Sequence, residues 1–365
     1  MTKVAVLGGG QLGRMLALGG IPLGCSFSFL DPSPDATAAA VGDLMVGELA
    51  DVDAARRAAK GADVVTYEWE GVPATTAVAL QELAPVHPTP AALDIAQDRL
   101  IEKQTLNNLG VATAPFRAVD SRPELDAAAD ALGLPAVLKT RRGGYDGKGQ
   151  AVLREHADFD AAWAALCGIP LILEGFVAFD RELSIIAVRA HDGELRAWPV
   201  VENVHRDGIL RVTTAPAPGF DDALQARAVA AIEPLLTSLD YVGVCCVELF
   251  QLGGELLANE IAPRVHNSGH WTIEGAQTSQ FENHVRAVTG MPLGDTSARF
   301  PCVMVNCIGA LPDRDAVLSI PGTHFHDYGK APRPGRKVGH VTITAADERA
   351  LDDCVAHVVR LVDEG

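Results

Sequence analysis

Two clusters in this chain combine residue types and spacings that suit phosphoryl chemistry. Residues 139–150 read KTRRGGYDGKGQ, a basic, glycine-rich loop entered from an apolar run, and residues 259–270 read NEIAPRVHNSGH. Glycine backbone amides and cations bind phosphate oxygens, and carboxylates bind a metal ion. A guanidinium can stabilise an activated acyl group. The two clusters together indicate an enzyme.

A pair of glutamates is placed to bind a divalent cation. Glu248 lies in an otherwise apolar run, where a carboxylate is costly to bury unless it is paired or binds a cation. Glu260 follows a glycine turn and is expected to face Glu248 across antiparallel strands, with Asn259 in the same site. Two carboxylates, phosphate oxygens and water make a typical magnesium site, and manganese also fits. The alternative is a salt bridge to a nearby arginine.

An earlier glycine loop is less specific. Gly8, Gly10 and Gly13 have the G-x-G-x-x-G spacing between a strand and a helix, and Asp31 lies near the position of a ribose-binding acid. The pattern is compatible with a dinucleotide, with another phosphorylated ligand at the same helix end, or with a tight turn alone. The rest of the chain favours another phosphorylated ligand over a dinucleotide.

The elements that must position these residues divide the chain into three regions. Strands alternate with helices over residues 1–93, which predicts a parallel, doubly wound α/β sheet. Residues 94–297 begin with an amphipathic helix over 94–109 and continue as α+β, with a helix at 225–236. A small third region, 298–365, should contain a strand at 302–307, a basic turn at 329–340 and a helix at 348–362. The strands expected in the middle region are 135–140, 171–177, 183–189, 195–201 and 242–250.

Composition excludes several classes of protein. A hydrophobic fraction of 48% supplies ample core for 365 residues, but no run approaches the roughly 18 apolar residues of a membrane span. The net charge of −17 argues against a nucleic-acid binder. The first residues run into glycines and not into a signal-peptide core. We expect a cytoplasmic protein with no membrane or nucleic-acid partner.

The order of a Rossmann-like region, a lysine before a glycine loop and a late Asn-Glu pair resembles the ATP-grasp ligases. More closely, the chain resembles the N5-carboxyaminoimidazole ribonucleotide synthetase family of purine biosynthesis over nearly its whole length. Val265 departs from the family, which often has proline there. The resemblance implies an ATP-grasp fold with a Rossmann-like N-terminal domain (1–93), an ATP- and magnesium-binding domain (94–297) and a small C-terminal domain (298–365). The matching segments are 8–15, 67–70, 98–99, 143–150, 174–177, 180–184, 267–274, 277–284, 328–330 and 333–340.

The resemblance also implies roles for individual residues. Arg264, His266 and Asn267 would act on bicarbonate and the carboxylated intermediate, and Glu248 and Glu260 would bind the metal. The residues implied for ATP are Arg99, Lys139, Gly144, Tyr145, Asp146, Gly147, Lys148, Gly149, Gln150, Glu174, Gly175, Phe176, Val177, Glu182, His205, Asn259 and Glu260. The residues implied for the ribonucleotide are Gln11, Leu12, Glu70, Tyr145, Asp146, Lys148, Lys330 and Arg336.

The reaction implied is the ATP-dependent carboxylation of 5-aminoimidazole ribonucleotide by bicarbonate, through carboxyphosphate, in a homodimer. A related ligase that uses formate, or a carboxylate–amine ligase, is a second hypothesis, disfavoured by the 266–270 run and the Tyr328-Gly329-Lys330 segment. A nicotinamide dehydrogenase would leave the second glycine loop and both glutamates unexplained. A non-catalytic nucleotide sensor would retain the fold without turnover.

Overall fold

The N-terminal part of the chain forms the doubly wound sheet that the alternating pattern predicts. In the computed structural model, which describes residues 1–144 and 147–364 and only the backbone of residue 348, four parallel strands are ordered β3-β2-β1-β4. Apolar side chains fill these strands, and Val4 to Leu7 are almost wholly buried. The elements are β1 (Thr2–Leu7), α1 (Gln11–Gly20), β2 (Cys25–Asp31), β3 (Asp43–Val46), α2 (Val52–Ala58), β4 (Val64–Tyr67) and α3 (Ala74–Leu80), with short 3-10 turns at Ile21–Leu23 and Thr37–Ala40.

Two helices, not one, connect this sheet to the middle of the chain. The helix expected over residues 94–109 is divided into α4 (Pro90–Ala96) and α5 (Arg99–Asn108). Asp98 interrupts the helix because its backbone is extended. Its carboxylate caps the start of α5 by accepting a hydrogen bond from Leu100 N–H at 3.0 Å. The break places Arg99 at the first turn of α5.

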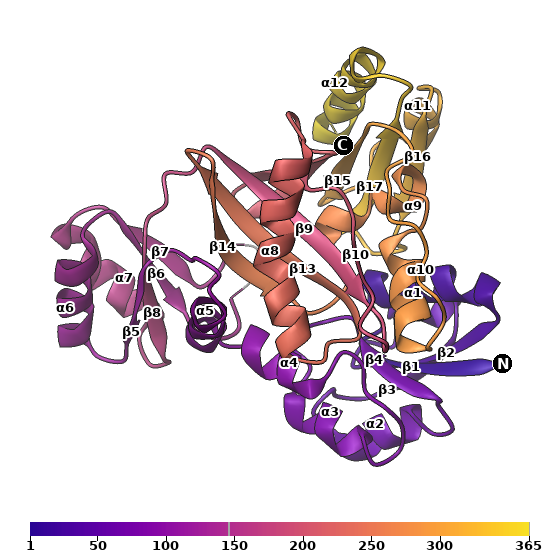
Figure 1. Cartoon of the computed structure of the whole chain (residues 1–365), viewed down its shortest axis with the longest axis horizontal. Coiled ribbons are helices and arrows are strands. Elements are labelled where there is room, and N and C mark those ends of the chain that lie inside the picture. Colours follow the sequence, from indigo (N-terminus) through magenta and orange to yellow (C-terminus); the bar gives the residue numbers. More distant parts are fainter. Residues whose placement is uncertain (145–146, 365) are drawn as a thin grey trace.

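A four-stranded antiparallel sheet follows, ordered β5-β8-β6-β7. Helices α6 and α7 lie beside it at the left of Figure 1, and α5 lies on its inner side. The glycine-rich loop connects β6 to β7, so it lies at one end of this sheet. The elements are β5 (Phe116–Val119), α6 (Arg122–Leu132), β6 (Ala136–Thr140), β7 (Gln150–Leu153), α7 (Phe159–Leu166), with a 3-10 turn at His156–Asp158 before it, and β8 (Leu171–Gly175).

A nine-stranded sheet forms the centre of the molecule, ordered β14-β13-β9-β11-β12-β15-β17-β16, with β10 paired to β9. Helix α8 (Asp222–Ser238) lies against β9 and β13 (Figure 1). The strand predicted over 195–201 is divided into β10 and β11, which both pair antiparallel with β9, and Pro199, which has no N–H to donate, lies between them. The strands are β9 (Arg181–Arg189), β10 (Leu195–Ala197), β11 (Val201–Arg206), β12 (Ile209–Ala215), β13 (Gly243–Leu252), β14 (Glu255–Ala262), β15 (Cys302–Ile308), β16 (Thr323–Asp327) and β17 (Lys337–Thr344).

The C-terminal strands continue the central sheet, because β15 pairs with β12. The basic turn ends earlier than predicted, since strand β17 begins at Lys337, and β16 is a strand that the sequence did not reveal. The division into three domains therefore stays a prediction. The remaining helices are α9 (Thr272–Gly275), α10 (Gln280–Val288), α11 (Arg314–Leu318) and α12 (Glu348–Glu364), with a 3-10 turn at Asn267–Gly269.

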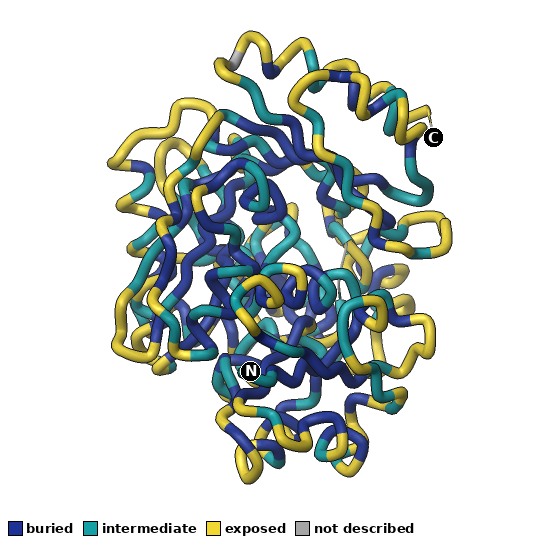
Figure 2. The backbone as a smooth tube through the Cα atoms, turned by 90° about the vertical axis from the view of Figure 1, so that its right-hand side faces the viewer, coloured by how far each residue is buried: buried dark blue, intermediate teal, exposed yellow. Residues whose placement is uncertain are grey.

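The core crosses the boundaries between these regions. One buried cluster contains residues of β1, β2, α1, the central sheet and α10, which packs against α1. Figure 2 shows the buried segments running through the middle of the molecule and the exposed segments at its ends. Within the ranges described, no helix has the length and apolar character needed to cross a bilayer.

Candidate active site

The paired glutamates face each other as the hairpin predicts. Glu248 on β13 is directly opposite Glu260 on β14. Burial, followed by the charge of Glu260, raises the pKa of Glu248 to about 7, because a second carboxylate close by disfavours the charged form. Arg99 approaches the pair, with its Nη2 atom 3.5 Å from Glu260 Oε2. The donor set fits magnesium or manganese.

Two carboxylates do not complete a metal site. In the described part of the chain, no group of three or more histidine, cysteine or acidic residues converges to hold a metal ion. A cation at Glu248 and Glu260 would therefore also need oxygen ligands from phosphates and water. Such a site binds its metal together with a nucleotide.

A buried cluster of one acid and two lysines links the four-stranded antiparallel sheet to β14, the strand that carries Glu260. Glu174 on β8 forms ion pairs with Lys139 at 2.9 Å and with Lys103 at 3.3 Å. Burial alone would raise the pKa of Glu174, but the two ammonium groups lower it below its ordinary value. Lys103 on α5 is 1% exposed and also donates to the Asn259 carbonyl on β14 at 3.2 Å. The sequence prediction missed Lys103, although it lies four residues after Arg99 on the same face of a helix.

The glycine-rich loop is held by Arg99. The Arg99 guanidinium donates to the Thr140 carbonyl at 3.3 Å and to the Gly144 carbonyl at 3.2 Å. Gly147 and Gly149 have φ angles of +75° and +71°, which glycine adopts without strain. Lys148 lies between them, and Gln150 begins β7 opposite Lys139. The predicted contacts of Tyr145 and Asp146 lie outside the described residues.

The segment after β8 presents backbone groups at the edge of the second sheet. Gly175 ends the strand, and its N–H donates to the Pro115 carbonyl at 2.8 Å. Phe176 is 47% exposed, so its side chain is available to contact a ligand. Val177 follows in the connection to β9 and is half-buried. These residues lie next to Glu174 along the chain, as the ATP assignment requires.

Glu182 and His205 come together from neighbouring strands. His205 Nδ1 is 2.5 Å from Glu182 Oε2, across the β9–β11 pair. Burial alone would lower the pKa of His205, but the hydrogen bond to Glu182 and the charge of Glu248 raise it. The imidazole therefore keeps its charge to a higher pH than an ordinary histidine, beside an acid suited to ribose hydroxyls.

Arg264 is fixed by an acid from the N-terminal sheet. Its Nε atom donates to Glu70, which lies just beyond β4. Burial disfavours the charge on each partner, but their mutual attraction lowers the pKa of Glu70 and raises that of Arg264. Glu70 was predicted to line the ribonucleotide, whereas here it orients the guanidinium. The second oxygen of the Glu70 carboxylate can still contact a ligand.

The proton position on His266 follows from its neighbours. Its Nδ1 atom accepts a hydrogen bond from Ser268 N–H at 3.3 Å. A backbone N–H can only donate, so Nδ1 is unprotonated and the neutral ring carries its proton on Nε2. That atom lies 3.4 Å from Glu248 Oε1. Burial, followed by the charge of Arg264, lowers the pKa of His266 well below its ordinary value, so the ring is neutral.

The first glycine loop is occupied by side chains of the protein itself. Glu68 accepts hydrogen bonds from Gly10 N–H and Gly13 N–H, each at 2.7 Å, and Asp31 accepts from Gly9 N–H at 2.8 Å. A phosphate at this helix end would have to displace the Glu68 carboxylate. The amides of Gly9, Gly10 and Gly13 therefore bind internal carboxylates, and a phosphorylated ligand at this helix end stays a prediction.

The two ends of the chain meet at the predicted ribonucleotide site. Lys330 Nζ donates to Gln11 Oε1 at the start of α1. Arg336 lies in the same turn as Lys330, and its guanidinium donates to the Ala331 carbonyl at 3.2 Å. The Leu12 side chain is buried in the hydrophobic core and 8% exposed, so the contact predicted for this residue would have to come from its backbone.

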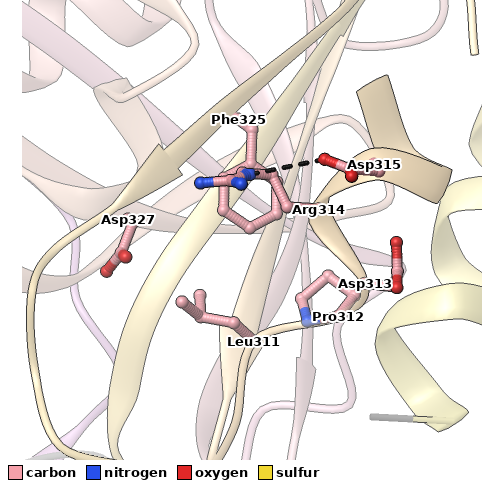
Figure 3. Close-up of a pocket in the computed structure, with 7 residues that line it drawn as sticks. All are labelled: Leu311, Pro312, Asp313, Arg314, Asp315, Phe325 and Asp327. Carbon is pink, nitrogen blue, oxygen red and sulfur yellow. Dashed lines mark ion pairs between the residues drawn. The ribbon is translucent and has the colours of Figure 1, made fainter. Parts of the chain in front are cut away.

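A surface pocket in the C-terminal region shares no residue with this site. Figure 3 shows its lining, in which Arg314 approaches Asp315 with Nε and Oδ1 3.6 Å apart. Its carboxylates outnumber its single guanidinium, so it would repel phosphates. The lining residues are Leu311, Pro312, Asp313, Arg314, Asp315, Phe325 and Asp327.

Three family models match consecutive parts of the chain. They are the ribonucleotide synthetase preATP-grasp domain over residues 1–97, the ATP-grasp domain over 104–281 and the phosphoribosylaminoimidazole carboxylase C-terminal domain over 302–353. Together they follow the order of the three predicted regions.

Several proteins are similar to this chain over nearly its whole length. The N5-carboxyaminoimidazole ribonucleotide synthase of Pseudomonas aeruginosa is 52% identical over 99% of both chains. The solved synthetase of Thermus thermophilus has a TM-score of 0.96 at 54% identity, covering 99% of both chains. The Aspergillus clavatus synthase, solved with ADP and 5-aminoimidazole ribonucleotide, has a TM-score of 0.94 at 33% identity, over 100% of this chain and 99% of that one. The glutamates face each other, Arg99 links the glycine-rich loop to Glu260, and on these whole-chain similarities the chain belongs to the N5-carboxyaminoimidazole ribonucleotide synthase family.

Proposed function

We propose that this chain carboxylates 5-aminoimidazole ribonucleotide with ATP and bicarbonate, giving N5-carboxyaminoimidazole ribonucleotide, ADP and phosphate in purine biosynthesis. The observation that carries the proposal is the continuity of β14. Glu260 lies on this strand opposite Glu248, and the chain continues directly into Arg264 and His266. The groups for metal-bound phosphates and for the acyl intermediate thus come from one short segment.

The chain's own residues would position ATP. Lys139 supplies a cation beside Glu174, and Arg99 connects the glycine-rich loop to Glu260 on β14. Magnesium held by Glu248 and Glu260 would neutralise charge on the phosphates. The loop would exclude water when closed, which matters because an acyl phosphate hydrolyses readily.

The acyl step depends on a charged guanidinium beside a neutral imidazole. A bicarbonate oxygen attacks the γ-phosphorus and ADP leaves. The exocyclic amine then attacks the carboxyl carbon, phosphate leaves, and the proton lost by the amine passes to that phosphate. Arg264, kept charged by Glu70, would stabilise the negative charge of the intermediate. His266 presents an N–H from Nε2, so it would orient an oxygen and would not remove a proton in this tautomer.

The ribonucleotide phosphate would lie near Lys330 and Arg336, outside the ATP site. Lys330 is held by Gln11, and the turn that carries both cations is pinned by prolines and glycine in the sequence APRPGRK. We also propose a homodimer that works in the cytoplasm, on the family resemblance. Sedimentation analysis of the purified chain would show a monomer if the dimer assignment is wrong.

The test is ADP release by the purified protein with ATP and magnesium, followed by omission of the ribonucleotide, bicarbonate or magnesium in turn. We expect each omission to remove most of the activity. Glu260→Gln should abolish turnover, and Glu255→Gln, an exposed acid on the same strand, should retain it. ADP release that ignores the ribonucleotide, from protein that binds ATP, would remove the substrate assignment.

A further inference from the structure

Two adjacent residues, His266 and Asn267, form a segment called here the His266–Asn267 step. It lies beyond the end of β14, so no neighbouring strand fixes its conformation. Two carboxamide side chains that belong to no predicted site contact it instead. Gln280 is the first residue of α10 and 0% exposed, and Asn306 lies on β15 and is 1% exposed. They approach the step from different elements of the fold.

Gln280 binds both backbone groups of His266. Its Oε1 atom accepts from His266 N–H at 2.9 Å, and its Nε2 atom donates to the His266 carbonyl at 2.6 Å. The carboxamide thus takes the place of a neighbouring strand, since buried backbone groups must find partners. The fit is tight, because a Cβ atom on Gly269 would lie 2.6 Å from Gln280 Oε1.

Asn306 fixes which way the Asn267 amide faces. Its Nδ2 atom donates to the Leu210 carbonyl at 3.0 Å and to Asn267 Oδ1 at 2.7 Å, and its Oδ1 atom accepts from Asn267 Nδ2 at 3.0 Å. The Leu210 carbonyl can only accept, so it determines the orientation of Asn306. The reciprocal pair then determines the orientation of Asn267. Each remaining hydrogen-bonding group of Asn267 has a defined direction.

We infer that Gln280 and Asn306 are positioning residues for the carboxyl-transfer step, Gln280 acting through the backbone of His266 and Asn306 through the amide of Asn267. The inference rests on the proposed function. Catalysis of this kind depends on placement, and a displacement of about 1 Å can cost about 100-fold in rate. Fully satisfied buried polar networks are suited to such placement because they rigidify the core.

A matched control exists on the same helix. Asn283 on α10 is also 0% exposed, and its carboxamide likewise binds both backbone groups of one residue, Gly294, at 2.7 and 3.2 Å. Gly294 is not part of the predicted site. Gln280→Glu and Asn283→Asp therefore make the same chemical change in the same surroundings, and only the first contacts the site.

The experiment compares kcat, the KM for ATP and the melting temperature of Gln280→Glu, Asn306→Ala and Asn283→Asp with the unmodified protein. We expect the first two to lower kcat by about 10- to 100-fold with the KM for ATP unchanged within about twofold. Asn283→Asp should lower the melting temperature to a similar extent and keep kcat within about twofold. Gln280→Met and Asn306→Ser serve where the first substitutions do not fold.

Double variants separate positioning from general stability. If Asn306 acts through Asn267, then Asn306→Ala should cost no further activity in an Asn267→Ala background. Gln280→Glu should cost none in a His266→Ala/Asn267→Ala background, which removes both side chains that this backbone positions. The inference would be overturned if the kcat losses of the single variants multiplied in the combined variants. It would also be overturned if Gln280→Glu and Asn306→Ala folded and kept the kcat of the unmodified protein. Absence of ribonucleotide-dependent ADP release from the unmodified protein would instead refute the proposed function, so the two failures are distinguishable.

Discussion

Lys330 is a cation whose charge depends on pH in the working range of the enzyme. Burial lowers its pKa to about 8, despite the attraction of Glu68, and the nearby Arg336 and Lys337 lower it further. The charged form binds a phosphate dianion, so the protein loses this contact as the pH rises through 8. Below pH 7 the ammonium is fully formed.

We therefore expect the KM for the ribonucleotide to rise about tenfold per pH unit above 8, while the KM for ATP stays constant. Steady-state kinetics between pH 7 and 9 would measure both. In Lys330→Met the ribonucleotide KM should already be high at pH 7 and should no longer change with pH. A pH dependence that survives in this variant would assign it to another group.

At the scale of elements, α5 connects the two sides of the nucleotide site. Arg99 at its start holds the glycine-rich loop, and Lys103 one turn later bridges Glu174 and the Asn259 carbonyl. Lys103→Met should leave the Glu174 carboxylate with one ammonium partner. We expect a loss of about 2 kcal/mol in the free energy of unfolding, since the buried carboxylate keeps only one of its two charged hydrogen-bond partners.

The same substitution should raise the KM for ATP about tenfold, because no side chain then connects Glu174 to the Asn259 carbonyl on β14. Urea unfolding and ATP kinetics would check the two effects. Arg56→Met is the control, since Arg56 and its partner Glu82 are exposed, and surface pairs contribute less than about 1 kcal/mol. Equal losses in both variants would mean that Lys103 has no special role.

The glycine-rich loop offers a second prediction at this scale. A Cβ atom on Gly147 would lie 3.1 Å from Gly208 Cα and 3.2 Å from the Asp207 carbonyl, in the β11–β12 hairpin. Gly147→Ala should therefore keep the loop from closing on the hairpin. We expect kcat to fall about tenfold and the ratio of ADP to carboxylated product to rise, since the acyl phosphate meets water.

Gly143→Ala is the comparison for that variant. Gly143 has a φ of +76° in the same loop, but a Cβ atom there would meet nothing within 4 Å. It therefore shares the backbone strain, about 1 kcal/mol, without the collision. The ratio of ADP to carboxylated product, measured for both variants, separates the effect of backbone strain from that of blocked loop closure. Equal ratios in the two variants would contradict the closure argument.

Sequence patterns predicted the elements and the polar residues near the chemistry, but not the connections among them. The facing of Glu248 and Glu260 followed from a hairpin between two short strands, which is local information. The capture of the first glycine loop by Glu68 did not, because it joins residues 55 positions apart. Gln280 and Asn306 were missed for the same reason, since their partners are set by how α10 and β15 pack.

At the scale of the whole molecule, distant segments complete one site. Gln11 and Lys330 meet across 319 positions, Glu70 and Arg264 across 194. The contacts come from the N-terminal sheet, the central sheet and the C-terminal turn. The residues proposed to contact ATP, by comparison, lie within the middle of the chain. Binding of the ribonucleotide should therefore depend on docking between regions more than binding of ATP does.

The α1–α10 interface gives a direct test of this dependence. A Cβ atom on Gly19 would lie 2.9 Å from Glu282 N and 3.1 Å from the Phe281 carbonyl carbon, both rigid backbone atoms of α10. Gly19→Val should push α1 away from α10, at a cost of about 1–3 kcal/mol in stability. Because α1 begins with Gln11, the partner of Lys330, the ribonucleotide site should open.

We expect Gly19→Val to raise the KM for the ribonucleotide at least tenfold and to leave the affinity for ATP within about twofold. Calorimetric titration with ATP and steady-state kinetics with the ribonucleotide would measure the two. Leu18→Ala changes the adjacent residue, which is 52% exposed, and should alter neither by much. If Gly19→Val weakened both ligands equally, the N-terminal region would support the whole protein and not the ribonucleotide site in particular.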